Sequence, residues 1–188
     1  NILPYKNSPT YIHETLDTIT CKIGPKSFYQ THSKQASVLY EKAREMAGFR
    51  GNEIVYDLYC GIGSIALYLA GFVNKITGIE MIPEAIEYAK ENARINQLAN
   101  VHFIAGKTED LFNTETIDEH GFPDVIMIDP PRAGMHKKVI KRLLETAPEK
   151  IIYISCHPAG QVRDIQQLAA LYSIKEVQPV DMFPHTHH

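Results

Sequence analysis

The chain has 188 residues, of which 44% are hydrophobic and 9% aromatic, with 19 Lys and Arg against 22 Asp and Glu and a net charge of -3. This composition is typical of one folded domain, and it excludes a disordered, collagen-like or disulfide-stapled chain. At this length folding buries roughly 70% of the surface of the unfolded chain, so stability requires no metal or disulfide. The net charge by itself does not favour a polyanionic partner.

Cysteine usage and hydropathy indicate a reducing compartment and no membrane association. The three cysteines, Cys21, Cys60 and Cys156, cannot all pair, and none lies in the close Cys/His spacing of a zinc site. The sequence shows no signal-like start and no apolar run near the roughly 18 residues that a membrane helix needs. We therefore expect a cytoplasmic protein without a metal centre.

Charge is unevenly distributed along the chain. Residues 1–50 carry 7 basic and 4 acidic groups, residues 51–128 carry 4 and 12, and residues 129–164 again carry 7 and 4. An acidic middle between two mildly basic segments would give one negative and one positive face, although solvated helix surfaces produce the same counts.

The first 32 residues differ from the rest of the chain. They are rich in Pro, Thr and Tyr without helical periodicity, and only 18–23 has the pattern of a strand, ahead of the Gly24-Pro25 turn. We expect residues 1–32 to be an entry segment from a preceding region and residues 33–188 to form the main domain.

From residue 33 onward, short apolar strands alternate with amphipathic helices. The spacing predicts helices over 34–47, 64–70, 83–96, 137–146 and 161–171, and strands over 54–58, 75–80, 101–105, 124–128, 151–155 and 174–180. Only the connection from 106 to 123 lacks a long helix. The alternation implies right-handed crossovers and an α/β fold whose parallel sheet is covered on both faces.

Polar and glycine residues gather where the predicted strands end. These ends are 57–64, 80, 106–107, 129–132 and 155–158. In an open sheet of this kind, ligands bind beyond the carboxyl ends of the strands, near the point where the strand order reverses. We therefore expect the functional site at this edge of the sheet.

The first two strand ends indicate a nucleoside-containing cofactor. Gly61 and Gly63 follow a strand and open a helix, where a ligand can approach the backbone closely, although any tight turn there needs glycine. Glu80 ends the next strand and is placed to accept hydrogen bonds from both hydroxyls of a ribose. A GxG pair without a third glycine favours S-adenosylmethionine over a dinucleotide, because no pyrophosphate needs a cradle at the helix start.

Asp129-Pro130-Pro131-Arg132 predicts a stiff loop after a fully apolar strand. Two prolines fix the backbone and remove two N–H donors, so the loop presents carbonyls and one carboxylate. A wall of this kind, with Pro130 in it, suits a planar base, and Arg132 suits a phosphate or a carboxylate. A strand that simply stops at Pro-Pro is nevertheless common in α/β domains.

Cys156 is the candidate nucleophile. It follows the next strand and precedes a helix, whose dipole stabilises a thiolate, the reactive form of a thiol. A lone cysteine is commonly a buried core residue. Cys156 lies at the same edge as Asp129 and Gly61, whereas Cys21 and Cys60 have no comparable neighbours.

These motifs together resemble those of the RNA uracil-5-methyltransferases, which make 5-methyluridine in tRNA and rRNA. The resemblance runs from about Lys22 to His188 and rests on Phe28-Tyr-Gln30, Asp57-Leu-Tyr-Cys-Gly-Ile-Gly63, Asp129-Pro-Pro-Arg-Ala-Gly134, Tyr153-Ile-Ser-Cys-His-Pro158, Arg163-Asp164 and Asp181-Met-Phe-Pro-His-Thr-His-His188. The last motif is closest to the branch that acts on 23S rRNA. An RNA partner is therefore expected, with 23S rRNA favoured over tRNA.

The resemblance implies a Rossmann-like S-adenosylmethionine methyltransferase sheet and a set of site residues. Cys156 would be the nucleophile, and S-adenosyl-L-methionine would lie against Gln30, Tyr59, Gly61, Gly63, Ser64, Glu80 and Asp129. A thiolate added to C6 of uracil makes C5 nucleophilic enough to take the methyl group, after which a base removes the C5 proton and the cysteine leaves. The uracil must also be unstacked from its RNA.

Several positions depart from the family pattern. The family usually has Asn where His32 and His157 stand, and a protonated His157 would favour the thiolate of its neighbour. It has Asp or Asn where Lys107 stands, so this lysine either weakens the cofactor site or points outward. The resemblance places the family's proton-abstracting Glu and the last of seven strands beyond His188, and an RNA-binding barrel ahead of this segment. We therefore expect an incomplete catalytic domain.

Two other functions fit part of the pattern. A methyltransferase for an exocyclic amine would hold that amine with Asp129-Pro-Pro and leave Cys156 incidental. A non-catalytic cofactor- or RNA-binding module would fit Lys107, the two histidine substitutions and the absent base.

Overall fold

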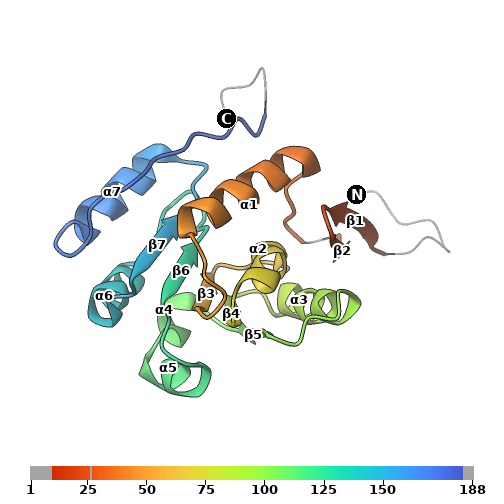
Figure 1. Ribbon diagram of the computed structural model, residues 1–188, viewed down its shortest axis with the longest axis horizontal. Helices are drawn as coiled ribbons and strands as arrows, with labels where there is room; N and C mark the ends of the chain where they lie inside the picture. The colour runs from red at the N-terminus through yellow and green to blue at the C-terminus, as the bar shows by residue number, and fades with distance from the viewer. Residues whose placement is uncertain (1–9, 26, 184–188) are drawn as a thin grey trace.

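Five parallel strands form the centre of the molecule, in the spatial order β5-β4-β3-β6-β7 (Figure 1). The computed structural model describes residues 10–25 and 27–183 of the chain. The strands of this sheet are β3 (Ile54–Leu58), β4 (Lys75–Glu80), β5 (Val101–Ala105), β6 (Val125–Ile128) and β7 (Lys150–Tyr153). The helices are α1 (Ser33–Ala47), α2 (Ser64–Leu69) with the 3-10 turn η1 (Ala70–Phe72), α3 (Pro83–Ile95), α4 (Thr108–Leu111), α5 (Thr114–His120), α6 (Lys137–Thr146) and α7 (Pro158–Leu168).

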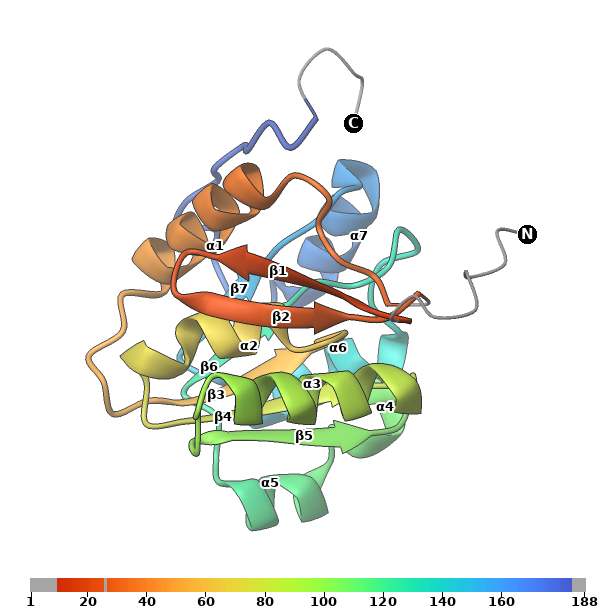
Figure 2. The ribbon, with the colours of Figure 1, turned by 90° about the vertical axis from the view of Figure 1, so that its right-hand side faces the viewer.

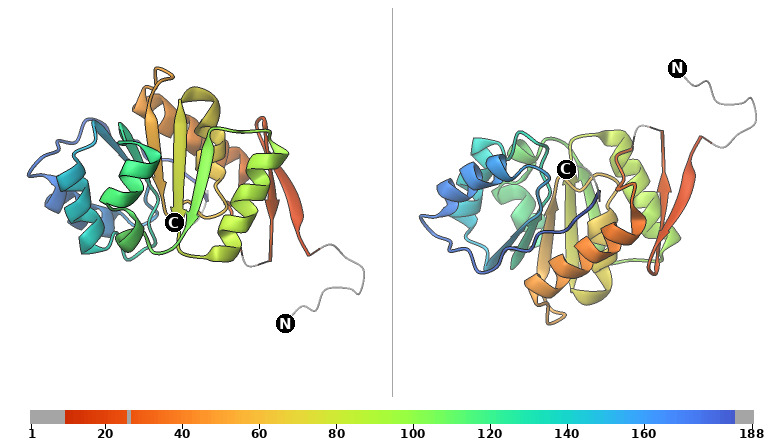
Figure 3. Two further views of the ribbon diagram at one scale, coloured as in Figure 1. Left: turned by 90° about the horizontal axis from the view of Figure 1, so that it is seen from below. Right: turned by 90° about the horizontal axis from the view of Figure 1, so that it is seen from above.

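Both faces of the sheet are buried, because successive side chains of each strand enter two separate cores. Val55 of β3 belongs to a core that also includes α1, α2 and α3. Its neighbour Tyr56 belongs to a second core with α6, Leu168 of α7 and Phe112. Figures 1 and 3 show the corresponding helices on opposite sides of the strands. We call these the first face and the second face of the sheet.

A two-stranded hairpin precedes the sheet and packs on the first face. Its strands β1 (Ile12–Leu16) and β2 (Ile19–Ile23) pair antiparallel around a tight turn at Asp17 and Thr18. Figure 2 shows the hairpin between α1 and α3. The side chains of Asn92 in α3 and of Asn96 at its C-terminal cap each hydrogen-bond both the N–H and the carbonyl of one residue of β2, at 2.7 to 3.2 Å. Two side-chain amides thus take the place of a neighbouring strand.

The expected element types are confirmed for the parallel sheet and its helices. Strands 54–58, 75–80 and 101–105 and helix 137–146 have the predicted bounds. The last helix begins at Pro158 rather than 161, because His157 caps it and proline is favoured in the first helical position. The connection 106–123 holds two short helices, and strand β1 was not predicted. The hairpin shares a core with α1 and α3, while the division of the chain at residue 32 stays a prediction.

The strand predicted over 174–180 is wrong. Residues 173–183 have no regular secondary structure, and Ile174 and Val177 are 62% and 74% exposed. Apolar spacing alone does not make a strand, since its backbone groups need a paired neighbour. The end of this segment lies against α1 instead: Met182 packs on the first core, and Gln35 donates a hydrogen bond to the carbonyl of Asp181.

Across the residues that the structure describes, no helix has both the length and the apolarity needed to cross a membrane.

Candidate functional site

The carboxyl ends of the strands form one edge of the sheet, and the strand order reverses there beside β3. The chain proceeds from β3 outward through β4 to β5, and then returns to the other side of β3 for β6 and β7. Crossovers to opposite sides leave a crevice beyond the ends of β3 and β6, which is where ligands bind in such sheets. The residues that follow these two strands are therefore the first candidates for a site.

Three carboxylates converge at this edge on the first face. Strand alternation puts Asp57 on the same face as Val55, Glu80 on the same face as Ile76, and Asp129 on the same face as Met127. The strands β4, β3 and β6 are neighbours, and Asp57 pairs in register with Gly78 and Met127, two residues before Glu80 and Asp129 on the same face. A row of acidic side chains on one face favours a ligand that carries hydrogen-bond donors and positive charge.

Among the described residues, Asp57 has one hydrogen-bond donor and the partly buried Asp129 carboxylate has none. Asp57 is 1% exposed, its Oδ2 accepts the N–H of Ala66 at 3.2 Å, and its Oδ1 has no partner among the described residues. Burial, followed by the charge of Asp129, raises the pKa of Asp57 to about 8, and burial raises the pKa of Asp129 to about 6. A cationic ligand with N–H donors would satisfy both groups.

Glu80 is held rigidly at the end of β4. One carboxylate oxygen accepts the N–H of Gly61 at 3.2 Å, and the other accepts the N–H of Ile82 at 2.9 Å. Each oxygen retains a lone pair, so Glu80 can still accept two hydroxyl groups. This geometry fits the predicted contact with a ribose.

The turn between β3 and α2 leaves room for a ligand beside its backbone. Gly61 has φ +55°, and a Cβ added to it would meet nothing within 4 Å. Gly63 has φ +81°, and a Cβ there would lie 2.6 Å from the ring of Phe103. The first glycine therefore borders open space, while the second allows α2 to pack closely on the sheet. Ser64 follows at the start of α2, where its Oγ lies 2.9 Å from the hydroxyl of Tyr40.

Gln30 and Tyr59 are less directly connected to this site. Tyr59 has φ +68°, and its side chain packs on the second face, opposite the three carboxylates. It can reach a first-face ligand only through its backbone. Gln30 lies partly buried in the segment that leads to α1, and its side chain makes no hydrogen bond to the described residues. Both residues stay predictions as cofactor contacts.

Cys156 lies on the turn between β7 and α7, at the same edge of the sheet. It is exposed, whereas Cys21 and Cys60 are buried, and burial raises the pKa of Cys21 to about 11. The neighbouring loop after β6 carries the buried Pro130 and the exposed Arg132. The structure therefore brings Cys156, Pro130 and Arg132 into adjacent loops, as predicted, and leaves one accessible thiol at this edge.

Three histidines cap the helices that begin near this edge. Nδ1 of His32, His136 and His157 accepts a backbone N–H in the first turn of α1, α6 and α7, at 3.2 to 3.3 Å. An asparagine oxygen performs the same task at a helix start. The two substitutions at His32 and His157 therefore preserve the capping acceptor that asparagine would supply.

Other residues, to which the sequence alone gave no role, also belong to the site. Tyr40 links α1 to Ser64, and Asp164 of α7 binds both the loop after β6 and the end of β7. Strand alternation could have revealed Asp57, and the Arg163-Asp164 motif marked Asp164 without giving it a role, but no local pattern marks Tyr40. Lys107 is exposed and points to no cap or carboxylate in the described residues. Lys107 was expected either to weaken the cofactor site or to point outward, and the structure shows an outward side chain.

The residues present fit S-adenosylmethionine. Gly61 borders open space, Glu80 has two lone pairs available, and Asp57 and Asp129 form a partly unsatisfied acidic pair. These features match a ribose and a positively charged amino acid moiety, respectively. No three His, Cys, Asp or Glu side chains in the described part of the chain are arranged to hold a metal ion.

Known proteins resemble this chain in sequence and in structure. Residues 10–188 match the model of the family described as tRNA (Uracil-5-)-methyltransferase. A protein of Bacteroides thetaiotaomicron described as an RNA methyltransferase is 53% identical over 178 residues, which cover 95% of this chain and 39% of that protein. One of Porphyromonas gingivalis with the same description is 51% identical over 180 residues, with the same coverage. The chain thus spans about two fifths of these relatives.

A solved structure extends the comparison to three dimensions. The crystal structure of Pyrococcus abyssi tRNA (uracil-54, C5)-methyltransferase in complex with S-adenosyl-L-homocysteine superimposes with a TM-score of 0.81 at 36% identity. The match covers 95% of this chain and 42% of that one. The α/β sheet is therefore that of an S-adenosylmethionine methyltransferase.

Proposed function

The chain belongs to the tRNA (uracil-5-)-methyltransferase family, and from that premise we propose that it is the catalytic part of an S-adenosylmethionine-dependent RNA uracil-C5 methyltransferase. The observation that carries the proposal is the position of the exposed thiol of Cys156 beside the Pro130 loop, one strand away from Asp129 and two strands away from Asp57. A nucleophile and a cofactor site thus share one edge of the sheet.

The residues at the ends of β3 and β4, together with Asp129, are the part of the site that we call the cofactor half, and they bind and orient the cofactor. S-adenosylmethionine, when bound, supplies a methyl group on a positively charged sulfur. Glu80 accepts the ribose hydroxyls, and the backbone of Gly61 borders the same space. Asp57 and Asp129 face the positive charge, which favours their ionised forms. Ser64, Gln30 and the backbone of Tyr59 complete the proposed contacts.

The loops that carry Cys156, Pro130 and Arg132 form the target half of the site, where the covalent bond to the base is made. The Cys156 thiolate forms a bond to C6 of uracil, and the C5=C6 electron pair moves onto C5 and the O4 carbonyl. Bound S-adenosylmethionine would supply the methyl group that C5 takes, and its sulfur would keep the electron pair of the methyl–sulfur bond. A base takes the C5 proton, the C5=C6 bond reforms, and the thiolate leaves. Pro130 and Arg132 would hold the unstacked base and an adjacent phosphate.

The RNA itself has two candidates. The C-terminal motif beginning at Asp181 favours 23S rRNA, while the Pyrococcus abyssi relative is described as acting on tRNA. Residues 184–188 of that motif lie outside the described residues. Mass mapping of 5-methyluridine in both RNAs, from cells with and without the gene, separates the two.

Trapping with RNA that contains 5-fluorouracil tests the covalent step. Fluorine at C5 cannot be removed as a cation, so the thioether between Cys156 and C6 persists and the protein migrates as an RNA adduct. We expect an adduct with the full-length parent and with Cys21→Ala, and none with Cys156→Ala. Turnover should fall on the order of 10³-fold or more in Cys156→Ala. Undiminished turnover by Cys156→Ala would reject the mechanism and favour methylation of an exocyclic amine.

A further inference from the structure

Asp164 is a buried carboxylate with no place in the chemistry described above. It lies in the second turn of α7 and is 1% exposed. Its Oδ2 accepts the N–H of Met135 at 2.7 Å and the hydroxyl of Tyr153 at 2.8 Å. Its Oδ1 lies 3.6 Å from Nε of Arg163. One side chain therefore joins the loop after β6, the end of β7 and α7.

The loop after β6 is shaped around this carboxylate. Gly134 has φ +83°, and a Cβ added to it would lie 2.5 Å from Oδ2 of Asp164. The N–H of Gly134 donates to the carbonyl of Pro131 at 2.8 Å, and Arg163 donates to the carbonyl of Ala133. The stiff Pro130-Pro131 segment is thus fixed at its far end by α7. No residue with a Cβ would fit the position of Gly134.

The turn that carries Cys156 is fixed from the same helix. Tyr153, three residues before Cys156, donates its hydroxyl to Asp164, and its carbonyl accepts the side chain of Gln161 at 2.9 Å. His157, directly after Cys156, caps the helix that contains Asp164. The backbone carbonyl of Arg132 lies 3.2 Å from the position that a Cβ on Gly160 would occupy. Both loops therefore take their positions from α7.

We propose that Asp164 is a positioning residue that sets the geometry between the Cys156 nucleophile and the Pro130–Arg132 wall. The inference rests on the proposed function, since it assigns Asp164 to the addition of Cys156 to a base held by that wall. Asp164 acts through Met135 and Tyr153 and touches neither RNA nor cofactor. A shift of about 1 Å between a nucleophile and its target can reduce a rate on the order of 10²-fold.

Three variants of the full-length protein measure how each hydrogen bond of the Asp164 carboxylate contributes to the rate of adduct formation. Asp164→Ala removes both acceptors, and adduct formation with 5-fluorouracil RNA should slow on the order of 10²-fold. Asp164→Asn keeps one oxygen for Met135 and Tyr153, and the rate should recover to within about tenfold of the parent. Tyr153→Phe removes one hydrogen bond, and its rate of adduct formation should lie between the rates of Asp164→Ala and Asp164→Asn. The KM for S-adenosylmethionine should stay unchanged while kcat falls, because the cofactor half keeps all its contacts.

Glu53 provides the matched control. It is another buried carboxylate that binds loop N–H groups, those of Arg50 and Gly51, but it lies at the opposite edge of the sheet. Glu53→Ala should lower the unfolding temperature without slowing adduct formation by the folded protein. If Glu53→Ala and Asp164→Ala slow adduct formation equally, Asp164 is merely structural and the inference is overturned.

The outcomes separate this inference from the proposed function. An adduct with the parent and an undiminished rate in Asp164→Ala would overturn the inference and leave the proposed function standing. No adduct with the parent would overturn both. If Asp164→Ala does not fold, Tyr153→Phe decides: a parental rate in that variant counts against the inference, and a slower rate with unchanged KM supports it.

Discussion

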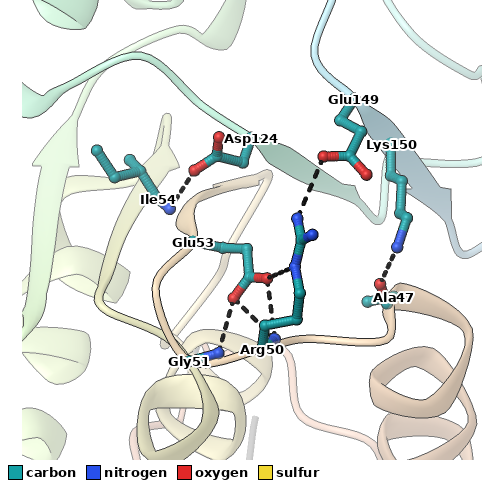
Figure 4. A network of polar contacts seen from close by, with 8 residues as sticks. All are labelled: Ala47, Arg50, Gly51, Glu53, Ile54, Asp124, Glu149 and Lys150. Carbon is teal, nitrogen blue, oxygen red and sulfur yellow. Dashed lines mark hydrogen bonds and ion pairs between the residues drawn. The ribbon is translucent and has the colours of Figure 1, made fainter.

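The two edges of the central sheet use buried carboxylates in opposite ways. At the amino ends of the strands, Glu53 and Asp124 each accept backbone N–H groups, and Glu53 also faces the guanidinium of Arg50 (Figure 4). At the carboxyl ends, Asp57 has an oxygen without a partner among the described residues, and Asp129 is partly buried with a raised pKa. Glu53 and Asp124 are thus supplied with N–H donors, as are Glu80 and Asp164 at the carboxyl edge, whereas Asp57 and Asp129 have few donors among the described residues.

The pKa values record this difference. Burial raises the pKa of Glu53, but the N–H groups of Arg50 and Gly51 and the Arg50 side chain outweigh burial, and the net shift is downward. Burial and the neighbouring acids raise the pKa of Asp57 to about 8. The donors around Glu53 belong to the fold, whereas the unpartnered oxygen of Asp57 leaves room for donors from a ligand.

The amino edge also binds successive elements together. Nη2 of Arg50 lies 3.5 Å from Glu149, and Nζ of Lys150 donates to the carbonyl of Ala47 at 2.7 Å, as Figure 4 shows. These contacts connect the end of α1 to the start of β7. Perturbing this edge should therefore cost stability, and perturbing the other should cost activity.

The largest effect is expected from the two aspartates that flank β6. Asp129→Ala should reduce kcat/KM for methyl transfer on the order of 10²-fold without lowering the unfolding temperature, because Asp129 lacks donors to lose. Asp124→Ala leaves the N–H of Ile54 without its acceptor at 2.8 Å and should cost about 1–2 kcal/mol of stability. Its kcat/KM should stay at the parental value. Kinetics and thermal unfolding of the two variants measure kcat/KM and stability. Equal losses of activity in Asp129→Ala and Asp124→Ala would contradict the difference between the two edges.

A second effect is an opposite pH dependence of stability. The folded pKa of Asp57 lies above its unfolded value, so its ionisation costs stability progressively as pH rises from the ordinary Asp range to about 8. Asp57→Asn should therefore gain stability over the parent across that range, on the order of a few kcal/mol. The folded pKa of Glu53 is lowered, so its contribution is present above the ordinary Glu range and lost as pH falls through the folded pKa.

Glu53→Gln should accordingly lose most stability at neutral pH and least in acid. Denaturant unfolding of the two variants and the parent from acidic to mildly alkaline pH provides the measurement. Curves that run in the same direction for both variants would contradict the assignment of one edge to the fold and the other to a ligand.

The smallest effect tests the histidine cap at the carboxyl edge. His157→Ala removes the acceptor for the N–H of Gly160 and should cost about 1 kcal/mol, whereas His157→Asn keeps an acceptor and should cost little. Thermal unfolding distinguishes the two, and the same pair at His32 serves as the control. Adduct formation by His157→Asn should remain at the parental rate. A marked loss there would restore the role of a protonated histidine beside the thiolate.

Sequence spacing predicted most of the fold and part of the site. Apolar runs of strand length predicted all five strands of the parallel sheet, because the three central strands β3, β4 and β6 are buried on both faces and the edge strands β5 and β7 keep mostly apolar residues. The same spacing failed at 174–180, where pairing rather than composition decides. Motif positions predicted that Gly61, Glu80, Asp129 and Cys156 would share one edge, since parallel strands bring their carboxyl ends together.

The sequence by itself therefore determined the order of strands and helices, the chemical character of each strand end and the family. Only the tertiary structure decided which of those acids have partners. Met135 and Asp164 are 29 residues apart, and Ile54 and Asp124 are 70 apart. A hydrogen bond requires contact in space, and local sequence patterns carry no information on groups that packing brings together across such separations. The positioning role of Asp164 and the shortage of donors around Asp57 emerged for that reason from the folded chain.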